Sequence, residues 1–216
     1  MNTKNYTLLS TMMFLQFFIW GAWFVTLGTY LSSTGFSGTE IGSAFLMNNI
    51  GAIISPFFIG LIADRFFAAE KIMGVLHIAG GLVLYYVSDL TTAGSIIFGL
   101  LIYNVCYMPT LALANTISFN QMTSPDTQFP KVRIWGTIGW IVAGLVISYG
   151  LAASYNNIET TAIPMKMAAI ASLVMGLFSF TLPKTPAQNT GKKTTIGDIL
   201  GLDALALMKD RSFAIF

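Results

Sequence analysis

Six apolar runs follow one another along this chain, and each is long enough to cross the hydrocarbon core of a membrane. They cover residues 8 to 31, 39 to 63, 72 to 88, 94 to 117, 131 to 153 and 163 to 182. A helix needs roughly 20 apolar residues to span the core, and lipid offers the backbone no hydrogen-bond partners outside the helix itself. The runs therefore predict an all-α integral membrane protein with six transmembrane helices.

Composition agrees with this prediction and excludes several classes of function. Only 9% of the residues are charged and 55% are hydrophobic, whereas about 25% are charged in ordinary soluble domains. A net charge of +2, dispersed along the chain, provides no basic patch for nucleic acid. The single cysteine, Cys106, excludes an intrachain disulfide. No spacing typical of a metal site, a phosphate loop or a nucleophile with its base is present, so we predict neither an enzyme nor a cofactor or metal.

Basic residues indicate which loops face the cytoplasm. The connections after the second and fourth runs carry Arg65 and Lys71, and Lys131 and Arg133, whereas the alternate connections are short and polar. Cytoplasmic loops of membrane proteins are enriched in Lys and Arg. We therefore expect both termini to be cytoplasmic.

The chain divides into three parts. Residues 1–182 form the six-span unit. Residues 183–211 begin as a polar, basic linker and become amphipathic from Ile196, which predicts a cytoplasmic central loop with a short helix at the membrane surface. Residues 212–216 turn apolar again, and we interpret them as the start of a truncated seventh span. The pattern predicts half of a larger protein.

Residues 129–140 place polar and aromatic side chains in an apolar helix, whose first turn we expect at Pro130. Arg133, Thr137 and Trp140 are spaced i, i+4 and i+7, so they share one helical face. Arg133 could anchor the helix end at the cytoplasmic surface or point into a polar cavity. Thr137 and Trp140, deeper on the same face, favour the cavity.

Two further stripes of candidate binding residues occupy the first and fourth runs. Gln16, Trp20 and Trp23 combine an amide with two indoles at membrane depth, where tryptophan is less common than at the interfaces. They favour a cavity in which rings stack a planar ligand, and the alternative is packing of the bundle core. Tyr107 lies on the other stripe, near Pro109, which bends its helix.

Other polar residues have weaker signals. Gly60, Asp64 and Arg65 follow the second span and form a candidate conformational gate, in which a breakable charge pair ties helix ends together. Its alternative is a surface salt bridge that contributes ~0–1 kcal/mol. His77, the only histidine, is expected to have a hydrogen-bonded packing role. No carboxylate lies in the middle of a span, so we expect the main proton-carrying group of a proton-coupled carrier to lie outside this chain.

These motifs together resemble the nucleoside:proton symporter family of the major facilitator superfamily, the bacterial nucleoside permeases. The resemblance extends along nearly the whole chain and is carried by residues 14–23, 60–65, 107–118, 129–140 and 200–207. It implies two six-helix halves, each built from two inverted three-helix repeats, with substrate held between the halves. This chain resembles the N-terminal half.

The resemblance also implies a function. It is that of a bacterial inner-membrane carrier that takes up nucleosides with protons by alternating access, together with the missing C-terminal half. Arg133, Thr137 and Trp140 fall where the family's nucleoside-contacting residues of the fifth span occur, and the second group of candidates is Gln16, Trp20, Trp23 and Tyr107. The alternatives are a related carrier for sugars or other polar solutes, and a non-transporting six-span membrane scaffold.

Overall fold

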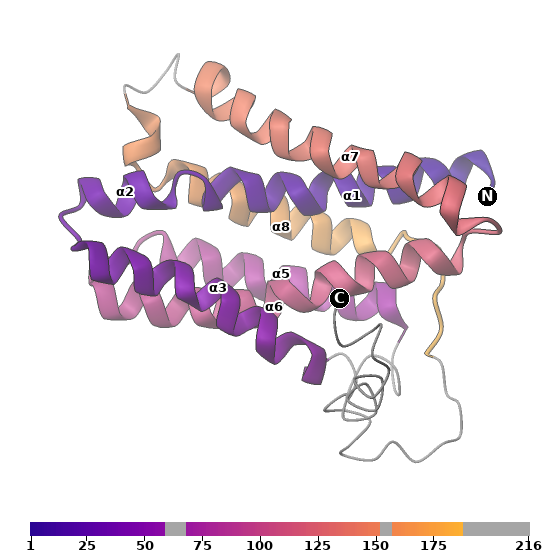
Figure 1. Ribbon diagram of the computed structural model, residues 1–216, viewed down its shortest axis with the longest axis horizontal. Coiled ribbons are helices and arrows are strands. Elements are labelled where there is room, and N and C mark those ends of the chain that lie inside the picture. Colours follow the sequence, from indigo (N-terminus) through magenta and orange to yellow (C-terminus); the bar gives the residue numbers. More distant parts are fainter. Residues whose placement is uncertain (59–67, 152–156, 188–216) are drawn as a thin grey trace, which may run out of the picture.

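The computed structural model describes residues 1–58, 68–151 and 157–187, and all regular structure in these ranges is helical (Figure 1). In chain order the elements are α1 (Thr3–Phe24), α2 (Leu27–Ser33), α3 (Gly38–Phe58), α5 (Ala69–Val87), α6 (Ala93–Asn120), α7 (Pro125–Leu145), the π-helix η2 (Val146–Leu151), the 3-10 helix η3 (Ile158–Thr160) and α8 (Ile163–Ser179). Each of the six apolar runs contains a helix, which confirms the all-α prediction.

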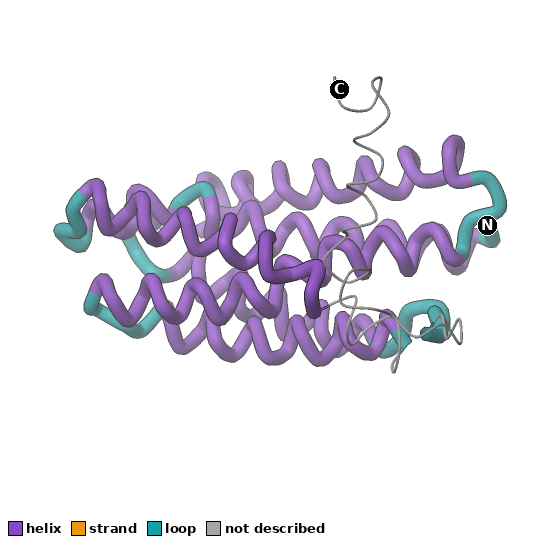
Figure 2. The backbone as a smooth tube through the Cα atoms, turned by 60° about the horizontal axis from the view of Figure 1, so that its bottom comes forward, coloured by secondary structure: helices purple, strands orange, loops and turns teal. Residues whose placement is uncertain are grey.

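Four of these helical segments are long and apolar enough to cross a membrane. They are Thr3–Ser33, Ala69–Val87, Ala93–Asn120 and Pro125–Leu151, while Ile163–Ser179 is a shorter apolar helix. The long helices run side by side, and the described loops lie at the two ends of the bundle (Figure 2). Large apolar side chains such as Ile53, Tyr86, Phe98 and Leu177 are exposed on its outside. Such a surface suits contact with lipid or with further helices.

The helix ends follow from local sequence, with one difference from prediction. Ser37 and Glu40 form a capping box at α3, in which the Ser37 backbone N–H donates to Glu40 Oε2 at 2.8 Å. The predicted start of α7 at Pro130 was wrong, because Pro125 already occupies the first turn and Pro130 lies inside the helix. Arg133 is therefore in the third turn, where the macrodipole, which acts mainly on terminal turns, has little effect on it.

The bundle is held together mainly by contacts between its two three-helix units. The first unit is α1–α2, α3 and α5, and the second is α6, α7 and α8. The most extensive packing joins α1 to α7, α5 to α8 and α3 to α6. Glycines permit the close approach, since a Cβ on Gly74 of α5 would lie 3.0 Å from the carbonyl of Gly176 on α8, and the reverse is also true. Each unit thus completes the core of the other.

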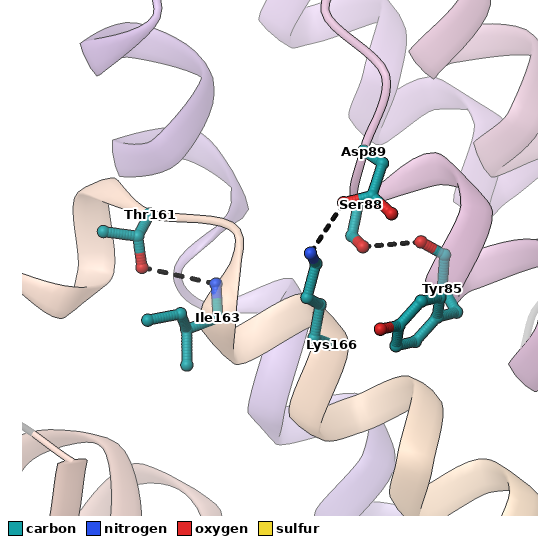
Figure 3. Close-up of polar contacts among 6 residues, drawn as sticks. All are labelled: Tyr85, Ser88, Asp89, Thr161, Ile163 and Lys166. Carbon is teal, nitrogen blue, oxygen red and sulfur yellow. Dashed lines mark hydrogen bonds and ion pairs between the residues drawn. The ribbon is translucent and has the colours of Figure 1, made fainter.

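The two ends of the bundle carry different polar contacts. At one end Asn5 donates to Gln121 at 3.0 Å, and the backbone N–H of Thr185 donates to buried Glu70 at 2.9 Å. At the other end Lys166 of α8 pairs with Asp89 after α5 at 2.6 Å (Figure 3). The segments that we predict to be cytoplasmic therefore meet at a single end. The predicted helix from residue 196 and the start of a seventh span lie outside the described residues.

Candidate functional site

The candidate site begins where α7 packs directly on α1. Gly136 lies against the ring of Phe17 and Gly139 against the backbone carbonyl of Phe14, so a side chain at either glycine would collide with α1. One turn after Gly136 on α7, the indole of Trp140 covers Gly21 of α1, where a Cβ would lie 3.1 Å from the indole. We call Gly136, Gly139 and Gly21 the glycine seam. Because the seam brings the backbones together, Trp140 reaches the aromatic side chains of α1.

Five rings from three helices form a continuous aromatic wall, which consists of Trp140, Trp20, Tyr107, Tyr103 and Trp23. Trp20 meets Trp140 edge to face with ring centroids 5.6 Å apart, and its centroid lies 6.2 Å from that of Tyr107. Tyr107 stacks on Tyr103 at 5.6 Å, and Tyr103 meets Trp23 edge to face at 5.3 Å. Trp20 and Trp140 are half-buried, whereas the other three rings are buried. Only the two tryptophans therefore present accessible ring surface.

Trp20 also carries an unused hydrogen-bond donor. Its indole N–H is buried and has no partner among the described residues. Buried polar groups in folded proteins nearly always have a partner, and an exception calls for a specific explanation such as a ligand or water. The exposed part of the ring can stack on a ligand in this conformation, whereas a ligand can reach the N–H only if neighbouring side chains move.

Arg133 and Thr137 lie on the same helix as Trp140. The guanidinium of Arg133 sits 3.9 Å from the centroid of the Phe17 ring, a cation–π contact within the seam between α7 and α1. The part of the chain that the structure describes places no carboxylate within ion-pair distance of Arg133. Its side chain is half-buried, and Thr137 is exposed. Both the anchor and the cavity interpretation of Arg133 stay predictions.

Gln16 contacts Tyr107 on the buried side of the wall, away from its accessible surface. The Tyr107 hydroxyl donates to the backbone carbonyl of Gln16 at 2.5 Å. The Gln16 side chain is fully buried, with Nε2 2.7 Å from Thr110 Oγ1 and Oε1 2.8 Å from His77 Nε2. His77 thus has the hydrogen-bonded packing role that its sequence context predicts. Its partners were not predictable, because they come from α1 and α8, distant in sequence.

A groove of about 180 Å³ continues from Trp140 along the ends of α1 and α7. Its lining includes Thr26, Ser148 and Glu159, which combine hydroxyls with a carboxylate beside the indole. Glu159 was not among the site residues predicted from the sequence. The gate candidates Gly60, Asp64 and Arg65 lie outside the described residues.

Comparison with known proteins identifies the family of this chain. The whole chain, residues 1–216, matches the family described as Nucleoside H+ symporter. The chain belongs to the nucleoside H+ symporter family. The chain is 44% identical over 214 residues to YegT of Escherichia coli (strain K12), a match that covers 99% of the chain and 50% of YegT. It is 36% identical over 213 residues to the xanthosine permease of the same organism, with 96% and 50% covered.

The fold comparison agrees with the sequence comparison. The crystal structure of nucleoside transporter NupG matches this chain with a TM-score of 0.83 and 35% sequence identity, covering 100% of this chain and 53% of that one. The chain spans about half the length of the curated relatives it matches. It has the fold of the N-terminal half of a major facilitator protein, and it is a bacterial membrane protein. These relatives are transporters and permeases, not enzymes, in agreement with the prediction.

Proposed function

We propose that this chain is the N-terminal half of a nucleoside transporter that couples uptake to protons and works by alternating access. The observation that carries the proposal is the accessible Trp20–Trp140 pair with its unpartnered indole N–H. Membership of the nucleoside H+ symporter family and similarity to the E. coli xanthosine permease and NupG support it. A nucleoside provides the two features that such a wall can recognise, a planar base and a polar ribose.

We propose that Trp20 and Trp140 recognise the base of the nucleoside. An aromatic side chain contributes ~1–3 kcal/mol when a base stacks on it, and the contact tolerates different bases. The Trp20 N–H is buried in this conformation, and once the wall opens it can donate to a base carbonyl or a ribose oxygen. Arg133 and Thr137, two turns and one turn before Trp140 on its helical face, supply further donors, because the guanidinium is engaged only through its face on Phe17.

Gln16, Trp23 and Tyr107 stay predicted substrate contacts of a second group. All three are buried in this conformation, so a nucleoside can reach them only after the wall opens. We propose that such opening accompanies the change between inward-facing and outward-facing states. Asp64 and Arg65, with Gly60, are proposed to stabilise one of these states through their charge pair.

The proposed assembly places both termini and the central loop, residues 183–211, in the cytoplasm, with the six-span unit in the inner membrane. The partner is a C-terminal six-span half that closes the other side of the substrate site. Protons are the proposed coupling ion. The described spans place no carboxylate at the aromatic wall, and Glu159, which lines the groove beside Trp140, lies before α8 and outside the spans. We therefore propose that the main proton-carrying group belongs to that other half.

Uptake of tritiated uridine into cells that lack their own nucleoside carriers tests the proposal. The chain alone is compared with the chain extended through its downstream coding sequence, and we expect uptake only from the extended form. Arg133→Ala is expected to abolish uptake in protein that reaches the membrane. Lys131→Ala, an exposed cation two residues away, is the matched control and retains it. Equal uptake by both variants would remove Arg133 from the site.

The same assay separates the alternative substrates. E. coli sucrose permease is 21% identical to this chain over 220 residues, far below the nucleoside carriers. We expect unlabelled nucleosides, and not hexoses, to compete with uridine. Absence of uptake from a well-inserted extended protein would favour another solute or the six-span scaffold.

A further inference from the structure

A cluster of buried polar side chains crosses the centre of the bundle behind the aromatic wall. We call it the Gln16 network, and its members are Gln16 of α1, His77 of α5, Tyr107 and Thr110 of α6, and Ser172 of α8. None of these side chains is more than 1% exposed. The network therefore links four helices in the buried interior, away from solvent.

The protons of the network can be placed from its contacts. Thr110 Oγ1 lies 2.6 Å from the carbonyl of Tyr107 and donates its proton there, so it accepts from Gln16 Nε2. Gln16 Oε1 must then accept, and the donor is His77 Nε2, 2.8 Å away. His77 Nδ1 lies 3.1 Å from the Ser172 hydroxyl, which itself donates to the backbone carbonyl of His77 at 2.9 Å. The contacts with Gln16 therefore place a proton on His77 Nε2.

We propose that His77 is a positioning residue for the substrate wall, which it sets through Gln16 without touching the substrate. The inference rests on the proposed transport function. Gln16 is joined to the wall twice: its carbonyl accepts from Tyr107, and Trp20 lies one turn further along α1. Trp20 in turn contacts both Tyr107 and Trp140. Fixing the Gln16 amide therefore fixes the rings that meet the base.

The physical reason is the cost of an unpaired acceptor in an apolar interior. Without His77, Gln16 Oε1 has no donor among the described residues, and a buried group left without its partner is strongly unfavourable. The side chain must then turn or admit water, and either change moves α1 relative to α6. Hydrogen bonds in such a network also polarise one another, so the effect extends to Thr110 and Tyr107.

Two conservative substitutions of His77 distinguish the contribution of Nε2, which faces Gln16, from that of Nδ1, which faces Ser172. The amide nitrogen of His77→Gln can take the place of Nε2 and donate to Gln16. The shorter amide of His77→Asn takes the place of Nδ1, so it reaches Ser172 and not Gln16. Ser179→Ala is the control, because Ser179 is a fully buried hydroxyl of α8 that bonds only to its own helix at Met175.

Kinetics of uridine uptake by the extended transporter give the first readout. We expect the KM to rise roughly five- to thirtyfold in His77→Asn and His77→Ala, in the range set by loss of one buried partner. In His77→Gln and Ser179→Ala the KM should stay within about twofold of the wild type. Equal KM changes in the Gln and Asn variants, or a lower amount of folded protein with an unchanged KM, would overturn the positioning role.

Near-ultraviolet circular dichroism of the purified extended protein gives a second readout that needs no substrate. The edge-to-face contact of Trp20 and Trp140 contributes to this spectrum, and Trp20→Phe shows the signal of its loss. We expect His77→Asn to shift the spectrum toward that of Trp20→Phe and His77→Gln to leave it unchanged. An unchanged spectrum in His77→Asn contradicts the inference. Absence of nucleoside uptake by the wild type, by contrast, contradicts the proposed function.

Discussion

Trp140 has two neighbours on α1, the backbone at Gly21 and the ring of Trp20, and still leaves part of its own ring exposed. We expect Trp140→Ala to reduce uptake at low uridine concentration by roughly five- to a hundredfold, since base stacking contributes ~1–3 kcal/mol. The amount of folded protein should change little, because part of the Trp140 ring is exposed. Uptake per molecule in the membrane is the quantity to measure.

Trp135 is the matched control for this substitution. It lies on the same helix, is 37% exposed and donates from its indole to the Tyr6 hydroxyl, away from the wall. Trp135→Ala should leave uptake per molecule unchanged. Similar losses in the two variants would mean that bulk at α7, and not the position of Trp140, sustains transport.

At single residues, sequence spacing predicted which side chains share a helical face but not how deeply they are buried. Trp20 and Trp23 lie on one predicted stripe, yet Trp20 is half-buried while Trp23 is covered by Tyr103. The difference comes from the neighbouring helix α6, which a one-helix pattern does not contain. The partners of Gln16 were hidden for the same reason, since His77 is 61 residues away and Thr110 is 94.

Between elements, the glycine seam leads to a stability prediction. A methyl group at Gly139 would overlap the Phe14 carbonyl, and overpacking of a tight contact typically costs about 1–3 kcal/mol. Gly139→Ala should therefore lower the unfolding temperature in detergent. Gly144→Ala, on the same helix with nothing near its Cβ, should keep or raise it, because alanine favours helix formation. Equal unfolding temperatures would contradict the close α1–α7 contact.

The elements themselves were predictable because hydropathy and capping are local properties. The six runs located the helices, and Pro125 and the Ser37–Glu40 box explain two of their starts. The error at Pro130 arose because two prolines compete for the first turn and only the earlier one follows the loop. Pairing of α1 with α7 could not be derived, since small residues permit an approach without specifying the partner.

Across the whole molecule, the segment that follows α8 is tied to the start of α5. The Thr185 N–H donates to Glu70 at 2.9 Å and its carbonyl accepts from Ala69 at 3.0 Å. We expect Glu70→Ala to release this segment and to accelerate tryptic cleavage after Lys184 severalfold. Glu159→Ala, a carboxylate at the opposite end, should not change the rate. Mass spectrometry of timed digests measures it, and an unchanged rate at Lys184 would show that the Glu70 bond does not restrain the segment.

The chain matches about half the length of its relatives. The sequence pattern predicted a half because residues 212–216, after the polar loop, turn apolar again. The residues that face Trp20 and Trp140 across the substrate site could not be predicted, because we propose that they belong to the C-terminal half.

The glycine seam has a mechanical consequence. At Gly139 the backbone of α7 lies directly on the Phe14 backbone of α1, and at Gly136 and Gly21 a single aromatic ring, of Phe17 or Trp140, fills the contact. Because so close a contact leaves little room to repack, we expect α1 and α7 to move as one rigid unit in the proposed transport cycle, with Trp20 and Trp140 moving together. The angle between the two indoles should then be the same in the proposed inward-facing and outward-facing states. The bending that accompanies the change should occur at the ends of the α1–α7 pair.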